Sequence, residues 1–289
     1  MSKVGVLTDS CASIPEALIG ELNIEVVPYY IHRGRETLRD LVDVKRREFF
    51  EWLATAKELP KTANPSAGDF LEAYKRLAER VKEIVSIHMT SLGSGAYQAA
   101  TVAKEMLART HPDVRVEVID SRQTSLCYGW MAIEAARAAL AGKNLDQIVA
   151  LVKEMIPKTK MIVTADTLKY LYMGGRIGKA QHLMGSLLNI KPLIGMEDGI
   201  IVPLGQARSR LGAYRKIVEM MERAVGHLGK VKVAFVHAAA LEEAEKLRAM
   251  VEERLTCVET LMAELSPALG VHTGPGTVGV CYFPLPDRP

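Results

Sequence analysis

The chain has 289 residues, of which 48% are hydrophobic and 25% are charged, with a formal net charge of +3. These proportions are typical of a folded globular protein and argue against a disordered chain. The small net charge and the 6% of aromatic residues do not favour nucleic-acid binding. No apolar run approaches the roughly 18–20 residues of a membrane-spanning helix, and the N-terminus lacks the apolar core of a signal peptide. We therefore expect a cytoplasmic protein.

The first half of the chain alternates between short apolar runs and helical patterns. The predicted strands are residues 4–7, 24–31, 84–89 and 114–119, and the predicted helices are residues 68–82, 95–109 and 132–140, with further helical patterns after Pro15 and around residues 49–54. Ser66 is in position to cap the helix over 68–82. This alternation predicts a mostly parallel sheet with helices on both faces, an α/β/α sandwich.

The pattern changes after about residue 157. The predicted strands are residues 161–165, 190–196, 199–203, 231–236, 257–265 and 278–283, with a helix after the first of them and helices over 211–225 and 241–255. An Asp-Gly pair at 198–199 favours a tight hairpin between two strands. We therefore predict an N-terminal α/β domain over residues 1–157 and a C-terminal α+β domain with a mixed sheet over residues 158–289. The boundary is expected within residues 153–160.

Residues 86–98 read SIHMTSLGSGAYQ, a strand end followed by a hydroxyl- and glycine-rich loop and a helix start. Backbone N–H groups at a helix start have no partner in the helix, and the helix dipole favours an anion there. Ser94 and Gly95 stand at this start and are candidates to bind a carboxylate or a phosphate. The alternative is that Ser94 only caps the helix. A dinucleotide motif would need glycine at Gln98, and a hydrolase elbow would need glycine at Leu92, so both are weak.

Three more residues are candidates for binding an anion. The hydroxyl of Thr62 has no capping role, because Ser66 caps the next helix. His272 lies in a segment rich in glycine and proline, whose backbone can approach a ligand closely, and its ring can donate a hydrogen bond. Arg176 follows two glycines that keep its guanidinium accessible to carboxylates or phosphates. The alternatives are a surface threonine, a structural histidine and a solvent-exposed arginine after a helix end.

Taken together and in order, these segments resemble the DegV family, which includes the fatty-acid-binding subunits of bacterial fatty acid kinase. The segment TANPS at 62–66 resembles the family's T-S-Q-P-S, and SGAYQ at 94–98 resembles S-G-T-Y-Q. The residues at 120–121, 168–177 and 191–192 also match. Ala63, Asn64 and Ala96 depart from the family pattern, whereas Thr62 and Ser94 keep it.

The resemblance implies a two-domain α/β protein that holds one long-chain fatty acid in an apolar tunnel between or beside its domains. It implies that Thr62, Ser94, Gly95 and His272 bind the carboxylate, and that a separate ATP-binding kinase subunit phosphorylates it to acyl phosphate. Arg176 is then expected to face this partner or the transferred phosphoryl group. The protein is expected to be a carrier in phospholipid metabolism, with no catalytic residue, cofactor, metal or nucleic-acid partner of its own and at most transient contact with a membrane surface.

Two alternatives belong to other classes of protein. The first is a serine esterase or acyl-transfer enzyme that uses Ser94 with His272, for which Asp9 or Asp120 would orient the histidine. The second is a phosphate- or nucleotide-binding protein that uses the loop at Ser94.

Overall fold

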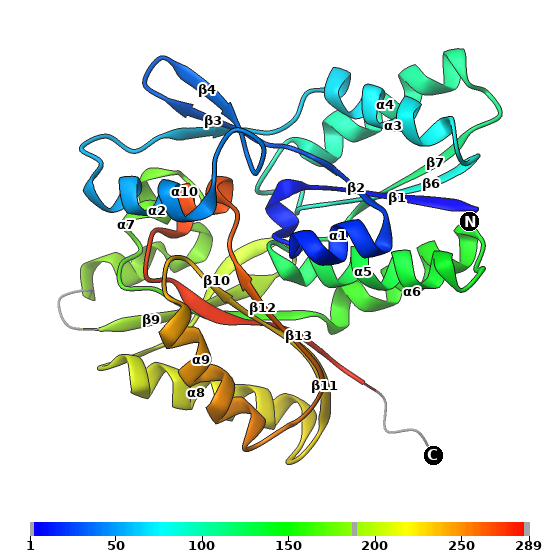
Figure 1. The fold of residues 1–289 in the computed structure, drawn as a ribbon. Coiled ribbons are helices and arrows are strands. Elements are labelled where there is room, and N and C mark those ends of the chain that lie inside the picture. Colours follow the sequence, from blue (N-terminus) through cyan, green and yellow to red (C-terminus); the bar gives the residue numbers. More distant parts are fainter. Residues whose placement is uncertain (1–2, 187–189, 286–289) are drawn as a thin grey trace. The chain divides into compact units, whose positions relative to one another are not determined.

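The computed structural model describes residues 3–186 and 190–285, which form two compact units (Figure 1). The first unit contains the chain up to Asp43 together with Thr62–Pro157. The second contains Val44–Lys61 and the chain from Lys158 onward. Within the described residues, no helix is long and apolar enough to cross a membrane.

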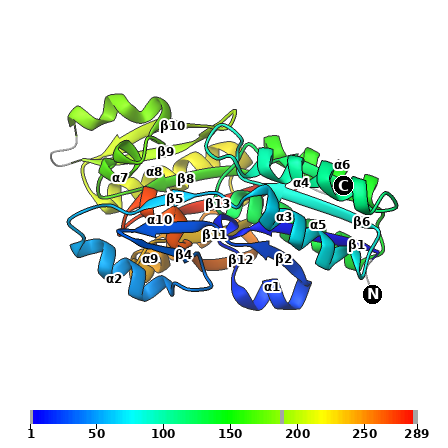
Figure 2. The ribbon, with the colours of Figure 1, turned by 90° about the horizontal axis from the view of Figure 1, so that it is seen from above.

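The first unit is built on a four-stranded parallel sheet. Its elements are β1 Val4–Asp9, η1 Ser10–Ala12, α1 Glu16–Leu22, β2 Ile24–Val27, β3 Tyr30–Arg33, β4 Glu36–Arg39, β5 Lys61–Ala63, α3 Ala67–Ala78, β6 Glu83–His88, α4 Ala96–Thr110, β7 Arg115–Asp120, α5 Leu126–Leu140 and α6 Leu145–Lys158. The sheet has the order β2-β1-β6-β7, and each neighbouring pair is parallel. Helices α3 and α4 cover one face, and α1, α5 and α6 cover the other (Figures 1 and 2). The predicted α/β/α sandwich is confirmed.

Helix α3 begins where the sequence places it. The hydroxyl of Ser66 accepts a hydrogen bond from the N–H of Asp69 at 3.1 Å, and the Asp69 carboxylate accepts one from the N–H of Ser66 at 2.7 Å. This reciprocal capping box satisfies N–H groups that a helix start leaves without helical partners. Phe70, Tyr74 and Leu77 recur every three or four residues and lie on the buried face of the helix.

The strand predicted over residues 24–31 is interrupted, so that prediction is wrong in its extent. Pro28 separates β2 from β3, because proline has no N–H to donate to a sheet. Strand β3 leaves the parallel sheet and pairs antiparallel with β4 around Gly34, whose φ of 60° favours glycine. Together with β5 these strands form a separate small sheet with the order β4-β3-β5.

The second unit contains a six-stranded mixed sheet. Its elements are α2 Arg46–Thr55, β8 Lys160–Thr164, α7 Lys169–Met173, η2 Gly178–Ser186, β9 Lys191–Glu197, β10 Ile200–Ala207, α8 Arg210–Val225, β11 Lys230–His237, α9 Leu241–Glu252, β12 Thr256–Glu264, α10 Pro267–Thr273 and β13 Val278–Pro284. The order is β10-β9-β8-β13-β11-β12; the pair β11–β12 is parallel and the other pairs are antiparallel. The predicted mixed sheet and the hairpin between β9 and β10 are confirmed, with Asp198 and Gly199 both at positive φ.

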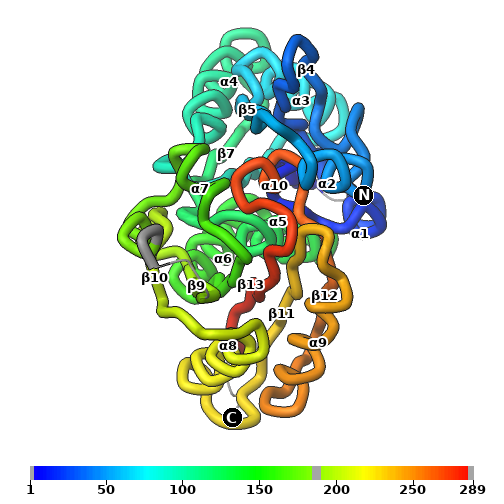
Figure 3. Tube along the Cα trace, turned by 90° about the vertical axis from the view of Figure 1, so that its left-hand side faces the viewer, coloured from blue at the N-terminus to red at the C-terminus, as the bar shows by residue number. Residues whose placement is uncertain are grey.

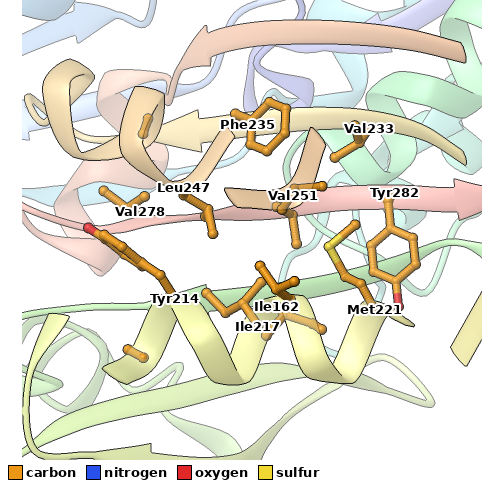
Figure 4. Packing of buried hydrophobic residues seen from close by; sticks show 14 of the residues in the cluster. Ile162, Tyr214, Ile217, Met221, Val233, Phe235, Leu247, Val251, Val278 and Tyr282 are labelled. Atoms are coloured by element: carbon orange, nitrogen blue, oxygen red, sulfur yellow. The ribbon is translucent and has the colours of Figure 1, made fainter. Parts of the chain in front are cut away.

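Helices α8 and α9 cover one face of this mixed sheet (Figures 1 and 3). Their buried side chains, such as Ile217, Met221 and Leu247, pack against Phe235 and Val278 of the strands (Figure 4). These side chains recur every three or four residues along each helix, which is the spacing of one helical face. The helices predicted over 211–225 and 241–255 therefore contribute the apolar faces that form the core of the second unit.

Residues 44–61 group with the second unit, whereas the predicted domains assign them to the first. The reason is the packing of α2 on α10, which lie side by side (Figure 3). Phe49 and Phe50 are buried there, and Phe50 lies so close to Gly270 that a Cβ on this glycine would come within 2.5 Å of the ring. Residues 153–158 are the end of α6, so the predicted boundary segment is largely helical. The division into domains 1–157 and 158–289 stays a prediction.

Candidate functional site

The order of strands in the parallel sheet reverses between β1 and β6. From β1 the chain continues to β2 on one side, and it later returns to β6 on the other side. At such switch points α/β proteins commonly bind ligands beyond the carboxyl ends of the strands. The turn that contains Ser94 connects β6 to α4 at this edge of the sheet.

This turn holds the hydroxyl of Ser94 at the start of α4. The carbonyl of Thr90 accepts hydrogen bonds from the N–H groups of Gly93 and Ser94, at 3.0 and 3.2 Å. The Ser94 hydroxyl accepts one from the N–H of Ala96 at 3.3 Å. Gly95 is the residue before the first helical residue and is exposed, and Ser94 is partly exposed. Ser94 and Gly95 therefore stand where N–H groups of the helix start face outward.

The segment with Thr62 lies against the same helix start. Thr62 is partly exposed on β5, the edge strand of the small sheet. Two residues later, the amide of Asn64 approaches Gly95 so closely that a Cβ on this glycine would be 2.9 Å from its Oδ1. The structure thus brings the segments of Thr62 and Ser94 together, although they are 32 positions apart in the sequence. Glycine at position 95 permits this approach.

Tyr29 is a residue of this site that the sequence did not point out. Its hydroxyl is 2.7 Å from the hydroxyl of Ser94, and only 4% of its surface is exposed. Tyr29 follows Pro28 between β2 and β3, close to the carboxyl end of β2, an edge strand of the parallel sheet. An aromatic residue after a buried strand is most often a core residue, so no signal in the sequence separates it from other tyrosines.

In the second unit, His272 and Arg176 meet at the end of α7. His272 lies on α10, and its Nδ1 is so close to Gly174 that a Cβ on this glycine would overlap it. Arg176 is exposed and donates from its guanidinium to the carbonyl of Gly174 at 2.7 Å. Gly175, at a φ of 68°, turns the chain between them. The predicted residues therefore fall into two groups, with Thr62, Ser94 and Gly95 in the first unit and His272 and Arg176 in the second.

The histidine of this second group is neutral at physiological pH. Burial and, to a smaller extent, the positive charge of Arg176 lower the pKa of His272 to about 4. A neutral imidazole carries one N–H, so it donates one hydrogen bond without adding a charge. His272 is thus suited to orient an anion and does not form an ion pair with it.

The loop after His272 lies against Arg210 and Asp166, which the sequence did not point out, and Lys191, from a segment that matches the family, joins them through Asp166. Lys191 and Arg210 both donate to the carboxylate of Asp166 at 2.5 Å, and Arg210 also donates to the carbonyl of Gly276 at 2.9 Å. Burial raises the pKa of Asp166, but the hydrogen bond from Lys191 and the charge of Arg210 outweigh this and lower it. The three charged residues are far apart in the sequence, so no local pattern joins them to the loop.

A serine, a histidine and an aspartate do meet in the first unit, but the serine and the histidine are not the Ser94 and His272 of the esterase alternative. His88 lies between Ser86 and Asp9, at 2.7 Å from the serine hydroxyl and 2.9 Å from the carboxylate. All three residues are fully buried, and the hydroxyl of Tyr128 also donates to Asp9 at 2.6 Å. Ser86 is therefore closed to a substrate. Of the two acids expected to orient a histidine, Asp9 belongs to this buried network and Asp120 accepts backbone N–H groups of the neighbouring turns.

Comparisons with known proteins agree with this architecture. The model of the uncharacterised proteins of the DegV family matches residues 3–285. A DegV domain-containing protein of Caldanaerobacter subterraneus is 33% identical over 98% of this chain and 99% of its own length. The protein DegV of Bacillus subtilis is 29% identical over 96% of this chain and 98% of its own length.

Two solved structures that share the fold are of proteins described as fatty-acid binding. A DegV family protein of Thermus thermophilus, described as fatty-acid binding, has a TM-score of 0.91 and 29% identity, and covers 99% of this chain and 100% of its own. DegV of Bacillus subtilis, described as a fatty acid binding protein, has a TM-score of 0.86 and 28% identity with the same coverage. The agreement extends over both units, and the chain belongs to the DegV family.

Proposed function

We propose that this protein binds a long-chain fatty acid and holds its carboxylate with the hydroxyls of Thr62 and Ser94, the backbone at Gly95 and the ring of His272. The observation that carries the proposal is the meeting of the Thr62 and Ser94 segments at the start of α4. Hydroxyls and outward N–H groups are neutral donors that bind a carboxylate. The ligand class comes from two relatives of the same fold that are described as fatty-acid binding.

Neutral donors suffice because the acyl chain supplies most of the binding free energy. Burial of apolar groups stabilises by about 0.8 kcal/mol per methylene, or about 10 kcal/mol for a chain of about sixteen carbons before the entropic cost of binding. The head group then only needs to be oriented. A strongly cationic site would hold the carboxylate too tightly for its later phosphorylation.

The proposal extends to a carrier role in phospholipid metabolism. The bound carboxylate is presented to the ATP-binding subunit of a separate fatty acid kinase, and Arg176 faces that partner or the transferred phosphoryl group. The protein itself supplies no catalytic residue, cofactor or metal. It works in the cytoplasm, does not bind nucleic acid and touches a membrane surface at most transiently.

Native mass spectrometry of the purified protein tests the ligand class. We expect an added mass equal to one long-chain fatty acid, which extracts into organic solvent. A nucleotide or phosphate mass would overturn the proposal in favour of the nucleotide-binding alternative. Steady release of p-nitrophenol from acyl esters, abolished by Ser94→Ala and retained in Thr62→Ala, would favour the esterase.

Substitution of the two hydroxyl residues tests the carboxylate site. Thr62→Ala and Ser94→Ala each remove a donor to a charged acceptor, which costs about 1.5–3 kcal/mol of binding free energy. Displacement of a fluorescent fatty acid measures this loss. Thr101→Ala is the matched control, because the Thr101 hydroxyl donates to the carbonyl of Tyr97 within α4. Unchanged affinity in the double variant Thr62→Ala/Ser94→Ala would remove both residues from the site.

A further inference from the structure

The hydroxyl of Ser94 lies between two groups of the protein. It accepts a hydrogen bond from the N–H of Ala96 at 3.3 Å and is 2.7 Å from the hydroxyl of Tyr29. Either hydroxyl of the second pair has the geometry to be the donor. The direction of this one bond decides where the proton of Ser94 points, because a serine hydroxyl has one proton and two lone pairs.

Hydrogen bonds to both backbone groups of Tyr29 fix its position between β2 and β3. Its N–H donates to the hydroxyl of Ser10 at 3.0 Å, and that hydroxyl donates to the carboxylate of Asp40 at 2.6 Å. The N–H of Asp40 in turn donates to the carbonyl of Tyr29 at 2.8 Å, which closes a ring of hydrogen bonds. At most 4% of the surface of any of these three residues is exposed. Both backbone groups of Tyr29 are therefore fixed, and its phenol is aimed at Ser94.

A carboxylate has only acceptor atoms, so the hydroxyl that meets it must donate its single proton to it. If Ser94 donated to Tyr29, that proton would be used within the protein. If Tyr29 donates to Ser94, the two lone pairs of the serine are taken by Tyr29 and Ala96, and its proton is left for the ligand. We infer that Tyr29 is a positioning residue, which donates to Ser94 and so directs the serine proton toward an anionic head group. This inference rests on the proposed function.

The two directions give opposite signs in one experiment. With Tyr29 as donor, Tyr29→Phe lets the Ser94 hydroxyl rotate, and the affinity for hexadecanoic acid falls by about threefold to tenfold, the range for one neutral hydrogen bond. With Ser94 as donor, the same variant frees the serine proton and the affinity rises. Unchanged or increased affinity in Tyr29→Phe would overturn the inference.

A neutral ligand separates positioning from general damage to the fold. Hexadecanol has the same number of carbon atoms in its chain but no charge, and its hydroxyl can donate as well as accept, so the direction of the serine proton matters less to it. We expect Tyr29→Phe to weaken the acid clearly more than the alcohol, as measured by displacement of a fluorescent probe. An equal loss for both ligands would mean that Tyr29 only supports the fold, and would overturn the inference.

A double-mutant cycle shows whether Tyr29 acts through Ser94. In the Ser94→Ala background, Tyr29→Phe should change the affinity for the acid by less than about twofold. Tyr74→Phe is the matched control, because Tyr74 is fully buried in the same unit and its hydroxyl donates to Ser86 at 2.9 Å. It should show no preference between acid and alcohol. A loss in the Ser94→Ala background as large as in the native protein would overturn the inference.

Ser10→Ala provides a second variant in case Tyr29→Phe folds poorly. It keeps the phenol and removes the partner of the Tyr29 N–H, so we expect a smaller loss of affinity than in Tyr29→Phe. Binding of the acid should again be weakened more than binding of the alcohol. Equal losses for both ligands would count against the inference.

The proposed function and the role of Tyr29 fail in different ways. If Ser94→Ala alone leaves acid binding unchanged, the proposed carboxylate site is wrong. If Ser94→Ala weakens acid binding and Tyr29→Phe does not, only the role of Tyr29 is wrong.

Discussion

The residues of the candidate carboxylate site were found in two ways, from the sequence and from the structure. Ser94 and Thr62 are candidates from the sequence, because Ser94 stands at a helix start and the hydroxyl of Thr62 has no capping role. Tyr29 joins them through the 2.7 Å contact of its hydroxyl with that of Ser94, which the tertiary structure reveals. Their roles as carboxylate ligands stay predictions, as does the role of His272. The structure adds that His272 is neutral near pH 7, with a pKa lowered to about 4 by burial and by Arg176.

Arg176 provides a prediction at this scale. Its guanidinium is exposed and anchored to the carbonyl of Gly174, so it can meet a partner without holding the ligand. We expect Arg176→Ala to leave fatty-acid affinity nearly unchanged and to reduce acyl-phosphate formation with a kinase subunit by about tenfold or more, because phosphoryl transfer depends on charge stabilisation. Arg176→Lys should restore only part of this rate, because lysine lacks the planar fork.

The measurement compares affinity and kinase-coupled turnover in the same preparation. Arg223→Ala, at another exposed arginine of the second unit, should change neither quantity. If affinity falls as much as turnover, Arg176 is a carboxylate ligand. If neither falls, it is an ordinary surface arginine.

At the scale of elements, close backbone approach decides how helices meet. Helices α7 and α10 pack with Gly174 against His272, and α2 packs with Phe50 against Gly270. In the first unit, Gly95 at the start of α4 meets Asn64 after β5. Each junction has a glycine where a larger residue would force the two segments apart. Sequence periodicity identifies the helices but does not identify their partners.

Gly174→Ala tests the junction of α7 and α10. A Cβ there would overlap Nδ1 of His272 and lie 3.1 Å from the carbonyl of Tyr170, so the imidazole must move. We expect the free energy of unfolding to fall by about 1–3 kcal/mol, as for other overpacked sites. The NMR signals of the His272 ring should shift, and fatty-acid affinity should decrease if His272 binds the carboxylate.

Gly20→Ala is the control for this variant. Gly20 lies in α1, and a Cβ there would have no heavy atom within 4 Å. Alanine is favoured over glycine in a helix, so this variant should be as stable as the native protein or slightly more stable. Unchanged His272 signals in Gly174→Ala would show that the junction accommodates a side chain without moving the ring.

For the whole molecule, the buried His237 and the partly buried His272 link stability to pH. Burial lowers the pKa values of His237 and His272 to about 4, from the ordinary value of 6.5. The unfolded chain therefore binds protons more readily than the folded chain between these values. The stability contributed by the neutral rings is complete above about pH 6.5 and is lost as the pH falls toward about 4.

We expect the free energy of unfolding to fall by at most about 2 kcal/mol per histidine between about pH 7 and pH 5. Chemical denaturation at several pH values measures this slope. Glutamine does not titrate, so His237→Gln and His272→Gln should each flatten the slope. His182→Gln is the control, since His182 is exposed. A slope that His237→Gln and His272→Gln both leave unchanged would show that carboxylates cause the pH dependence.

The sequence by itself determined the alternation of strands and helices, the parallel and mixed sheets, the capping of α3 by Ser66 and the hairpin at Asp198 and Gly199. These features follow from periodicity, caps and turn residues, which act over a few neighbouring positions. It also indicated the family through short segments in a fixed order.

The tertiary structure alone decided which distant segments meet. The break at Pro28 sends β3 into a second sheet, residues 44–61 group with the second unit, and the hydroxyl of Tyr29 lies at Ser94. The buried contact of Asp9 with His88 likewise joins residues 79 positions apart. Such pairings depend on how whole elements fill space around a core, and no local pattern in the chain encodes that packing.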